Sequence, residues 1–487
     1  MDQKRYQLSP NINFISDSQS GLTMAYHSLF GNPRILNREG VDFLELFNRP
    51  MTAKKISEIC DGSPEEIIDE FNAIYFIVEV GLDEREFLNK KRTEYLLKFI
   101  AGEFIDRMGL AISDSCNFNC NHCIHFQPSS KDECLAVYQK PYKKLIMDWP
   151  TAKKCVDFYT GLMKRRGLSH CKIHFGNAEP LINWPVIEKV LIYCDRMNDL
   201  TFEFCINTNL TLMTKQIAET LKKHHVNIST SLDGTHRAND AVRVFKGGRS
   251  TFRYIVEKFD LLDKVKYSLD GFSITVTKGN FDLIDVDVID FAKQRGMNFI
   301  AFDYDLISLT GIPLIDRVEK LMYFKNYANN VGIDFFGTWD SVFRNLTNQS
   351  LIYGNHAFCA AVEGRSLEFN VEGGIKVCSH MTEEVGHINY VEKLFKEGNR
   401  MYGLVRDRFP GSDKFCLGCI IEGPCGGQCH VTREADTRSI HGDVEQKGDL
   451  FIDMCEFYRM ITRRLALERI SSSVNNENLS NFVKRSF

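Results

Sequence analysis

The sequence predicts an α/β protein with three parts: a small N-terminal unit, a central series of β/α units and a C-terminal part rich in cysteine. Strand-like and helix-like segments alternate six times between about residues 105 and 305, which is typical of a parallel sheet in an open barrel or a doubly wound fold. At 487 residues the chain is long enough for about three domains. Ten of its 16 cysteines fall in two clusters, which indicates a metal framework beside ordinary buried thiols.

The composition argues against several classes of protein. The hydrophobic content of 44% and the charged content of 25% are ordinary for a folded globular chain. Because 60 Lys and Arg residues nearly balance 64 Asp and Glu residues, we expect neither nucleic acid nor membrane among the partners. The first residues do not form a signal peptide, and no apolar run approaches the roughly 20 residues of a membrane span. We therefore expect a cytoplasmic protein whose cysteines stay reduced.

Residues 1–90 are predicted to form a winged-helix-like domain. Thr52 can cap a helix over 53–60, and Ser63 followed by Pro64 is typical of the start of a second helix. The first helix mixes basic and acidic residues, which argues against a DNA-binding face. Strands are expected at 22–29, 34–36 and 76–80, and a linker helix covers 91–104.

The central domain is predicted over residues 105–330, and a bridging region follows over 331–357. The segments between its strands have the apolar spacing of amphipathic helices, and two of them stop at Gly167 and Gly296. The six strands are expected at 109–113, 171–175, 202–206, 227–231, 271–277 and 298–303.

The first cysteine cluster follows the first of these strands. Cys116, Cys120 and Cys123 have the spacing C-x3-C-x2-C, which can hold three irons of a [4Fe–4S] cluster and leave the fourth iron without a protein ligand. On spacing alone a zinc site remains an alternative, with His122 or His125 as the fourth ligand.

Polar residues also follow the next three strands. Glu179 comes after the second strand, Asn209 after the third, and Ser231 ends the fourth. Singly, each is also typical of an ordinary β/α turn. Because ligands bind at the carboxyl ends of parallel strands, these residues and the cysteines together predict one site.

This arrangement resembles the radical S-adenosylmethionine (SAM) enzymes, whose hallmark is the C-x3-C-x2-C loop. The resemblance covers about residues 105–305 and implies a partial (β/α)6 barrel in which SAM binds the open iron. It also implies that SAM is cleaved to a 5′-deoxyadenosyl radical, which abstracts a hydrogen atom from the substrate. Glu179 matches the acid of the family's Gly-Gly-Glu-Pro motif, and Asn177-Ala178 replaces the two glycines. The residues that the resemblance places around SAM are His122, Asn177, Glu179, Asn209, Ser231 and Arg243.

Seven more cysteines lie in the region 358–466, which precedes a polar tail over 467–487. Their spacing is a strong metal signal, although zinc knuckles remain an alternative on spacing alone. Beside a radical SAM core the set resembles the SPASM domain, which implies two auxiliary [4Fe–4S] clusters and three clusters in all. The resemblance assigns Cys416, Cys419, Cys425 and Cys455 to one auxiliary cluster, and Cys359, Cys378 and Cys429 to the other.

The combination of domains suggests a substrate. SPASM enzymes related in this way act on peptides, and the N-terminal domain resembles the PqqD-like recognition element, which binds the leader of a precursor peptide as an added strand. The resemblance implies a maturase that installs an oxidative cross-link in a ribosomally made peptide, with flavodoxin or ferredoxin as the reductant. Alternatives are a sulfatase-type maturase that makes formylglycine, a peptide epimerase and, from another class, a winged-helix iron–sulfur sensor.

The type of cross-link depends on the auxiliary clusters. Seven cysteines leave one of eight ligand positions open, and His356 is the nearest protein side chain that could fill it. A substrate thiolate in that position would favour a thioether over an ether or a carbon–carbon bond. Candidates for the catalytic base lie at and after the end of the sixth strand: Asp303, Tyr304, Asp305 and Asp340.

Overall fold

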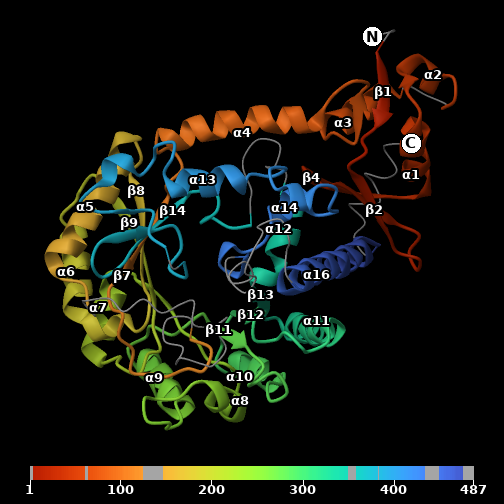
Figure 1. The fold of residues 1–487 in the computed structure, drawn as a ribbon. Coiled ribbons are helices and arrows are strands. Elements are labelled where there is room, and N and C mark those ends of the chain that lie inside the picture. Colours follow the sequence, from red (N-terminus) through yellow and green to blue (C-terminus); the bar gives the residue numbers. More distant parts are fainter. Residues whose placement is uncertain are drawn as a thin grey trace.

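A computed structural model gives the fold and describes residues 4–60, 64–123, 146–348, 358–381, 383–433 and 449–474. The β/α units curve around one side of the molecule, and the N-terminal unit lies at the other side (Figure 1). Between them runs the long helix α4 (Glu84–Ile100). The sequence predicted this helix to begin near residue 91; it begins at Glu84 because the Asp83 carboxylate accepts hydrogen bonds from the backbone N–H groups of Arg85 and Glu86.

The six predicted parallel strands are confirmed. Strands β7 to β10 are neighbours in one sheet and β11 and β12 in a second, and a parallel bridge between Ser231 and Ser273 joins the two sheets. The result is a partial barrel, as predicted. Its strands are β7 (Arg107–Ala111), β8 (His170–Gly176), β9 (Thr201–Asn207), β10 (Asn227–Ser229), β11 (Gly271–Val276) and β12 (Phe299–Tyr304).

Two further strands extend the barrel at its edges. Strand β13 (Asp334–Phe336) pairs in parallel with β12, and β14 (Ser366–Phe369) pairs in parallel with β7. Strands β15 (Gly374–Lys376) and β16 (Gly386–His387) follow β14 in antiparallel order. The cysteine-rich C-terminal part therefore continues the barrel sheet directly. The sequence did not predict these strands, since each has only two to four residues.

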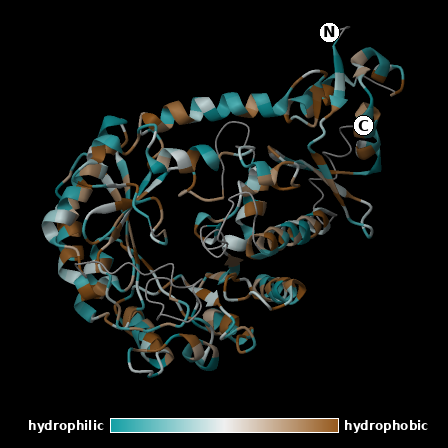
Figure 2. Ribbon diagram, in the orientation of Figure 1, coloured by the Kyte–Doolittle hydropathy of each residue, from teal (hydrophilic) through white to brown (hydrophobic). Residues whose placement is uncertain are grey.

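Helices cover the outside of the barrel. Their inner faces pack on the strands in one large core, and their outer faces carry hydrophilic residues (Figure 2). Asp148 caps the first of them by accepting a hydrogen bond from the Thr151 N–H at 2.9 Å. These helices are α5 (Trp149–Arg165), α6 (Trp184–Cys194), α7 (Lys215–Lys223), α8 (His236–Val242), α9 (Phe252–Lys264), α10 (Asp287–Gln294) and α11 (Leu314–Val331).

The N-terminal unit contains two small sheets and three helices. Thr52 caps a helix as predicted, since its hydroxyl accepts a hydrogen bond from the Lys55 N–H at 3.3 Å. The second predicted cap, Ser63, lies outside the described residues. One sheet has the order β5-β1-β6 and the other β2-β3-β4. The elements are β1 (Arg5–Leu8), β2 (Ile12–Ser16), β3 (Thr23–His27), β4 (Gly31–Leu36), α1 (Arg38–Glu45), β5 (Met51–Thr52), α2 (Ala53–Ser57), α3 (Glu65–Ala73) and β6 (Ile77–Glu79).

The second of these sheets packs against the C-terminal part. Helices α12 (Ser341–Thr347), α14 (Glu422–Cys425) and α16 (Asp449–Val474) form the surface that receives it. The Gly423 N–H donates to the Ser28 carbonyl at 2.9 Å, and an added Cβ at Gly423 would lie only 1.9 Å from the Leu29 carbonyl oxygen. Arg85 at the start of α4 also makes a bidentate ion pair with Glu422, at 2.8 and 2.9 Å. The N-terminal unit and the cysteine-rich part are therefore in direct contact.

Helix α16 also corrects a boundary. A polar tail was expected from residue 467, but the helix continues to Val474. It does so because Ala466 and Ile470 are fully buried in a small core with Met24 and Tyr26 of the N-terminal sheet. The sequence alone does not reveal this partner.

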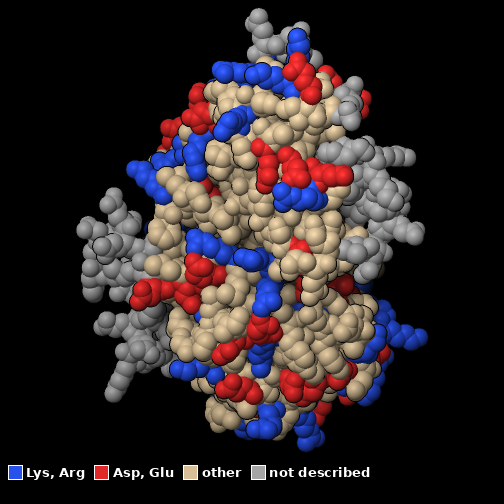
Figure 3. Space-filling model, turned by 90° about the vertical axis from the view of Figure 1, so that its right-hand side faces the viewer, with Lys and Arg blue, Asp and Glu red and all other residues tan. Residues whose placement is uncertain are grey.

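The surface agrees with the near-neutral charge. On the face shown in Figure 3, positive and negative side chains are interspersed and do not form a field of one sign. Among the described residues, no helix combines the length and the apolar character that a bilayer crossing requires.

Candidate functional site

A cavity of about 680 Å³ lies at the carboxyl ends of the barrel strands. Three groups of residues line it: the first cysteine loop, the loops after β8 to β12, and part of the C-terminal cysteine region. The cavity therefore joins the two predicted cysteine clusters in one space. Predicted site residues that line it are Cys116, Cys120, His122, Cys123, Asn177, Asn209, Ser231, Arg243, Asp303, Tyr304, Asp305 and Cys429.

The three cysteines of the first cluster lie on the loop after β7. Phe118 N–H donates to Cys116 Sγ at 3.4 Å, and Arg243 Nη1 lies 3.8 Å from Cys120 Sγ. Burial raises the pKa of Cys116 to about 11 and that of Cys120 to about 12, so these thiols keep their protons until a metal displaces them. Three thiols on one loop facing a large cavity fit a cluster with one open iron.

His122 lies in a cluster with Asp233 and Arg243, of which the sequence predicted His122 and Arg243 as site residues. Its Nε2 lies 3.4 Å from Asp233 Oδ2 and 3.4 Å from Arg243 Nη2. Asp233 is fully buried and makes an ion pair with Arg243, whose Nε lies 2.6 Å from Oδ2. Burial lowers the pKa of His122 to about 4, which keeps the imidazole neutral at pH 7. The described partners of His122 are thus Asp233 and Arg243, and Asp233, which lies in the loop between β10 and α8, was not predicted as a site residue.

The loop after β8 takes the conformation that glycines favour without having the glycines. Asn177 has φ +68° and Ala178 has φ +39°, both in the left-handed region. The Asn177 amide donates a hydrogen bond to Asp114, which stands two residues before the first cluster cysteine. The backbone path expected for a Gly-Gly pair is therefore kept, and Asn177 and Ala178 line the cavity.

Glu179 follows these two residues in the chain but is not among the side chains that line the cavity. Its side chain is fully buried, and its oxygens accept hydrogen bonds from Leu181 N–H at 3.0 Å, Thr208 Oγ1–H at 2.6 Å and Asn209 N–H at 2.8 Å. Burial raises its pKa to about 7. The carboxyl group thus ties the loop after β8 to the loop after β9, and its predicted contact with SAM stays a prediction.

The residues after β9 and β10 face the cavity as expected. Asn209 Nδ2 donates to Asn117 Oδ1 at 2.8 Å and lies 3.8 Å from Cys116 Sγ, so this amide fixes the cysteine loop. Ser231 stands where the two sheets meet, at the bridge to Ser273.

The four candidates for a catalytic base are not equivalent. Asp303 and Asp305 line the cavity, and burial raises the pKa of both carboxyl groups. Asp303 accepts hydrogen bonds from the Thr338 N–H at 2.5 Å and hydroxyl at 2.7 Å. Tyr304 donates its hydroxyl to the Arg317 carbonyl at 2.8 Å, and Asp340 pairs with Arg344 at 2.9 Å without lining the cavity. Geometry therefore favours Asp303 and Asp305.

The predicted cysteine set of one auxiliary cluster is brought together. Cys416, Cys419, Cys425 and Cys455 line one small pocket of the C-terminal part. Gln428 Nε2 donates to Cys455 Sγ at 2.7 Å. Arg459 Nε and Nη2 both lie 3.4 Å from Cys419 Sγ. Four thiols around one pocket, two of them with side-chain donors close to their sulfurs, fit a fully ligated [4Fe–4S] cluster.

The other set, Cys359, Cys378 and Cys429, also converges. Burial raises the pKa of Cys378 to about 12, and the neighbouring Cys429 and Cys359 add to this rise. Cys429 opens onto the large cavity beside Tyr458, which is 2% exposed. His356, the suggested eighth ligand, lies outside the described residues.

Comparisons with known proteins place these features among enzymes. No family model matches the chain. Over 475 residues, 96% of each protein, the chain is 25% identical to the radical SAM cyclopropyl synthase TigE of Paramaledivibacter caminithermalis. It is 21% identical over 349 residues, 66% of this chain and 87% of the relative, to a cysteine-type anaerobic sulfatase-maturating enzyme of Clostridium novyi.

Solved structures show the same fold. The chain is similar to anSMEcpe with bound AdoMet at a TM-score of 0.58 and 17% identity, over 78% of this chain and 98% of that one. It is similar to Streptococcus suis SuiB at a TM-score of 0.50 and 15% identity, over 91% and 99%. At such coverage the match to SuiB includes part of the N-terminal unit as well as the barrel and the cysteine-rich region.

Proposed function

Because the chain belongs with the radical SAM/SPASM enzymes, we propose that it modifies a ribosomally made peptide in the cavity between its two groups of cysteines. The observation that carries this proposal is the single cavity lined both by Cys116, Cys120 and Cys123 and by Cys429. A substrate held there would lie between the SAM cluster, where its hydrogen atom is abstracted, and an auxiliary cluster, which would accept its electron. Support also comes from the relatives, whose names include a cyclopropyl synthase and a sulfatase-maturating enzyme.

The residues of the cavity divide the work between holding SAM and holding the substrate. Cys116, Cys120 and Cys123 would hold the first [4Fe–4S] cluster, which with SAM supplies a hydrogen-abstracting radical. Asn177, Asn209, Ser231 and Arg243, together with His122, would surround SAM, and Glu179 keeps its proposed contact with SAM. On the opposite wall, Asp303 or Asp305 would take the proton that the substrate releases, since burial makes each a better base than an exposed carboxylate.

The auxiliary clusters would receive the electron that an oxidative cross-link releases. Their ligands in this proposal are the set Cys416, Cys419, Cys425 and Cys455 and the set Cys359, Cys378 and Cys429. With three cysteines the second set leaves a position that a substrate thiolate can fill, which supports a thioether product. The end-to-end likeness to a cyclopropyl synthase supports a second candidate product, a carbon–carbon bond. Flavodoxin or ferredoxin remains the proposed one-electron reductant.

The N-terminal unit is proposed to bind the leader of the precursor by β-augmentation. Its sheet β2-β3-β4 has two edge strands, β2 and β4, and residues 12, 13, 14 and 16 of β2 are at least partly exposed. We keep the domain order proposed from the sequence, with 1–90 for recognition, 91–104 as linker, 105–330 for SAM chemistry, 331–357 as a bridge and 358–466 for the auxiliary clusters, except that the linker helix begins at Glu84 and the last helix runs to Val474. Hydrogen exchange of the full chain with and without leader tests the mode of binding: protection of an edge strand supports it, and protection confined to the cavity contradicts it.

The reaction itself is tested with iron-loaded, reduced enzyme, SAM and the precursor encoded beside it. We expect 5′-deoxyadenosine and a peptide that has lost two hydrogen atoms for each new bond. Thiol alkylation of the product then separates the two candidates, because a thioether consumes a cysteine thiol and a carbon–carbon bond does not. A product that carries formylglycine would support the sulfatase-type alternative, and an unchanged mass with inverted stereochemistry would support an epimerase. Absence of 5′-deoxyadenosine would contradict the proposal.

A further inference from the structure

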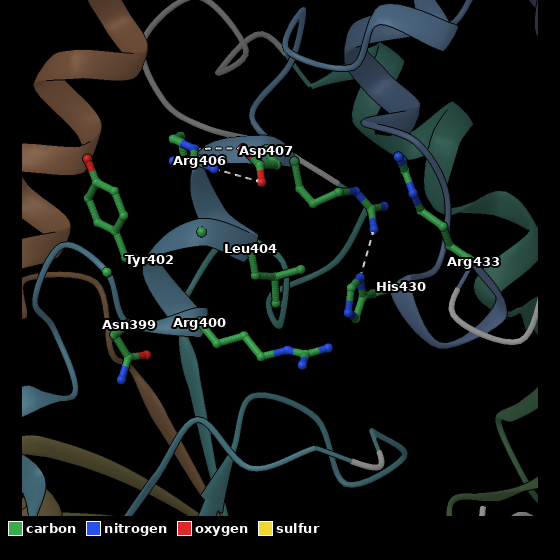
Figure 4. Close-up of a pocket in the computed structure, with 11 residues that line it drawn as sticks. Asn399, Arg400, Tyr402, Leu404, Arg406, Asp407, His430 and Arg433 are labelled. Atoms are coloured by element: carbon green, nitrogen blue, oxygen red, sulfur yellow. Dashed lines mark hydrogen bonds and ion pairs between the residues drawn. The ribbon is translucent and has the colours of Figure 1, made fainter. Parts of the chain in front are cut away.

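Arg408 is a buried cation without a carboxylate partner. It follows α13 (Arg400–Asp407) directly and is only 3% exposed. Among the residues that the structure describes, no Asp or Glu forms an ion pair with it, whereas its neighbour Arg406 pairs with Asp407 at 2.7 Å. Figure 4 shows Arg406 and Asp407 together at one side of the pocket beside α13, with His430 and Arg433 across from them. An unpaired buried charge is strongly destabilising, so Arg408 needs a source of negative charge.

The hydrogen bonds of Arg408 lead to the loop between the two auxiliary sets of cysteines, whose thiolates are a source of negative charge. Its Nε donates to the Gly426 carbonyl at 2.9 Å, its Nη2 donates to the Gln428 carbonyl, and its Nη1 lies 3.5 Å from His430 Nδ1. Both carbonyls belong to the three-residue loop that joins Cys425 of one auxiliary set to Cys429 of the other. Arg433 adds a second positive charge near Arg408, and the negative charges that act on Arg408 are those of Cys425, Cys429 and Cys359, which come from both sets.

The loop that Arg408 holds is conformationally demanding. Gly426, Gly427 and Gln428 have φ of 51°, 80° and 70°, three left-handed residues in succession. Gln428 is not a glycine, and its side chain is committed to Cys455 Sγ and to the Phe451 carbonyl. The guanidinium fork thus fixes a strained backbone whose two ends are cluster ligands.

We propose that Arg408 positions this loop and serves as the common counter-ion of both auxiliary clusters. Two iron–sulfur clusters ligated by thiolates carry net negative charge, which supplies the missing partner of the buried guanidinium. A fixed positive charge stabilises the reduced, more negative form of each cluster and so raises its reduction potential. Arg408 therefore makes both auxiliary clusters better electron acceptors. This role depends on the auxiliary clusters that the proposed function assigns to the chain.

The test compares Arg408→Gln and Arg408→Lys with Arg406→Gln, a matched control from the same end of α13. Iron per chain and the midpoint potentials of all three clusters are measured by EPR-monitored redox titration. We expect Arg408→Gln to lower both auxiliary potentials while that of the SAM cluster stays unchanged, Arg408→Lys to lower them less, and Arg406→Gln to change none. Selective loss of auxiliary iron in Arg408→Gln, with the SAM cluster retained, would also support the role.

Two results overturn the inference. One is an Arg408→Gln variant with full iron and unaltered auxiliary potentials. The other is loss of all three clusters together in both Arg408 variants, which would indicate general unfolding. Failure of the proposed function has a different signature: the unaltered chain would form no 5′-deoxyadenosine with SAM and reductant, whereas the auxiliary potentials of the Arg408 variants could still be compared.

Discussion

Arg317 and Asp453 form a bidentate ion pair, with Nη1 2.8 Å from Oδ2 and Nη2 2.5 Å from Oδ1. Arg317 lies on α11 of the barrel and is 1% exposed, and Asp453 lies on α16, two residues before Cys455. Tyr304, which lines the cavity, donates its hydroxyl to the Arg317 carbonyl. One arginine therefore ties the end of the sixth barrel strand to the helix that carries a predicted cluster ligand.

Replacing Asp453 by Ala should destabilise the chain, because it leaves the Arg317 guanidinium buried without a partner. We expect the free energy of unfolding to fall by about 3 kcal/mol, measured by urea denaturation of the apoprotein. The surface pair Arg464–Glu319 joins the same two helices and serves as the control: Glu319→Ala should cost less than about 1 kcal/mol. Equal losses in the two variants would show that burial of the pair is not what matters.

Replacing Cys116, Cys120 and Cys123 together by Ala should separate the first cluster from the other two. Three ligands are lost from one site, while the four cysteines of the pocket beside Gln428 are untouched. The variant should therefore still bind auxiliary iron and remain brown, yet form no 5′-deoxyadenosine with SAM and reductant. Iron analysis and product chromatography check both statements, and retained SAM cleavage would refute the site.

The sequence predicted the six barrel strands well because each is an apolar run followed by polar turn residues at the same edge. It also predicted that cysteines such as Cys416, Cys419 and Cys425 lie together, since close spacing along the chain brings thiols together whatever the surrounding fold. Contacts between distant segments carried no such signal. The pairing of Arg317 with Asp453, and the packing of Met24 and Tyr26 on Ile470, depend on how domains meet.

The barrel side of the cavity was predicted only in part. Asn177, Asn209 and Arg243, which line it, were predicted because each follows a strand or matches a motif. Asp233, which pairs with Arg243, stands among typical turn residues and gave no distinct signal. Glu179 was predicted from its motif, and the structure adds that its carboxyl group accepts three hydrogen bonds from its own protein.

The stability of the apoprotein should fall as pH rises from about 5 to 7. Burial raises the pKa of Glu368 on β14 from 4.5 to about 7, so the folded chain holds a proton that the unfolded chain has already lost in this range. Glu368→Gln removes this group from the titration and should reduce the loss of unfolding free energy between pH 5.5 and 7.5 by about 2 kcal/mol, since stability changes by about 1.4 kcal/mol for each pH unit up to the raised pKa. A remaining slope is expected, because burial also raises the pKa of Asp114 and of Glu179 to about 7. Urea unfolding at pH 5.5 and 7.5 measures the change in unfolding free energy in the unaltered chain and in Glu368→Gln. An equal change in both would contradict the raised pKa of Glu368.

The hydrogen bond between Asp114 and Asn177 should substitute for the glycine that this loop lacks. Asn177 is held at φ +68°, a conformation that glycine adopts freely and that asparagine adopts with help from its side chain. Asp114→Ala should therefore weaken SAM binding about tenfold, the equivalent of one lost hydrogen bond of about 1.4 kcal/mol, measured by equilibrium dialysis of the iron-loaded protein.

Asn177→Gly alone should bind SAM like the unaltered chain, and adding it to Asp114→Ala should restore most of the affinity, because glycine needs no support. Asn177→Ala is the matched control, since alanine has neither the amide nor the freedom of glycine and should bind as weakly as Asp114→Ala. If the double variant binds no better than Asp114→Ala, then Asp114 acts on SAM by some route other than the shape of this loop.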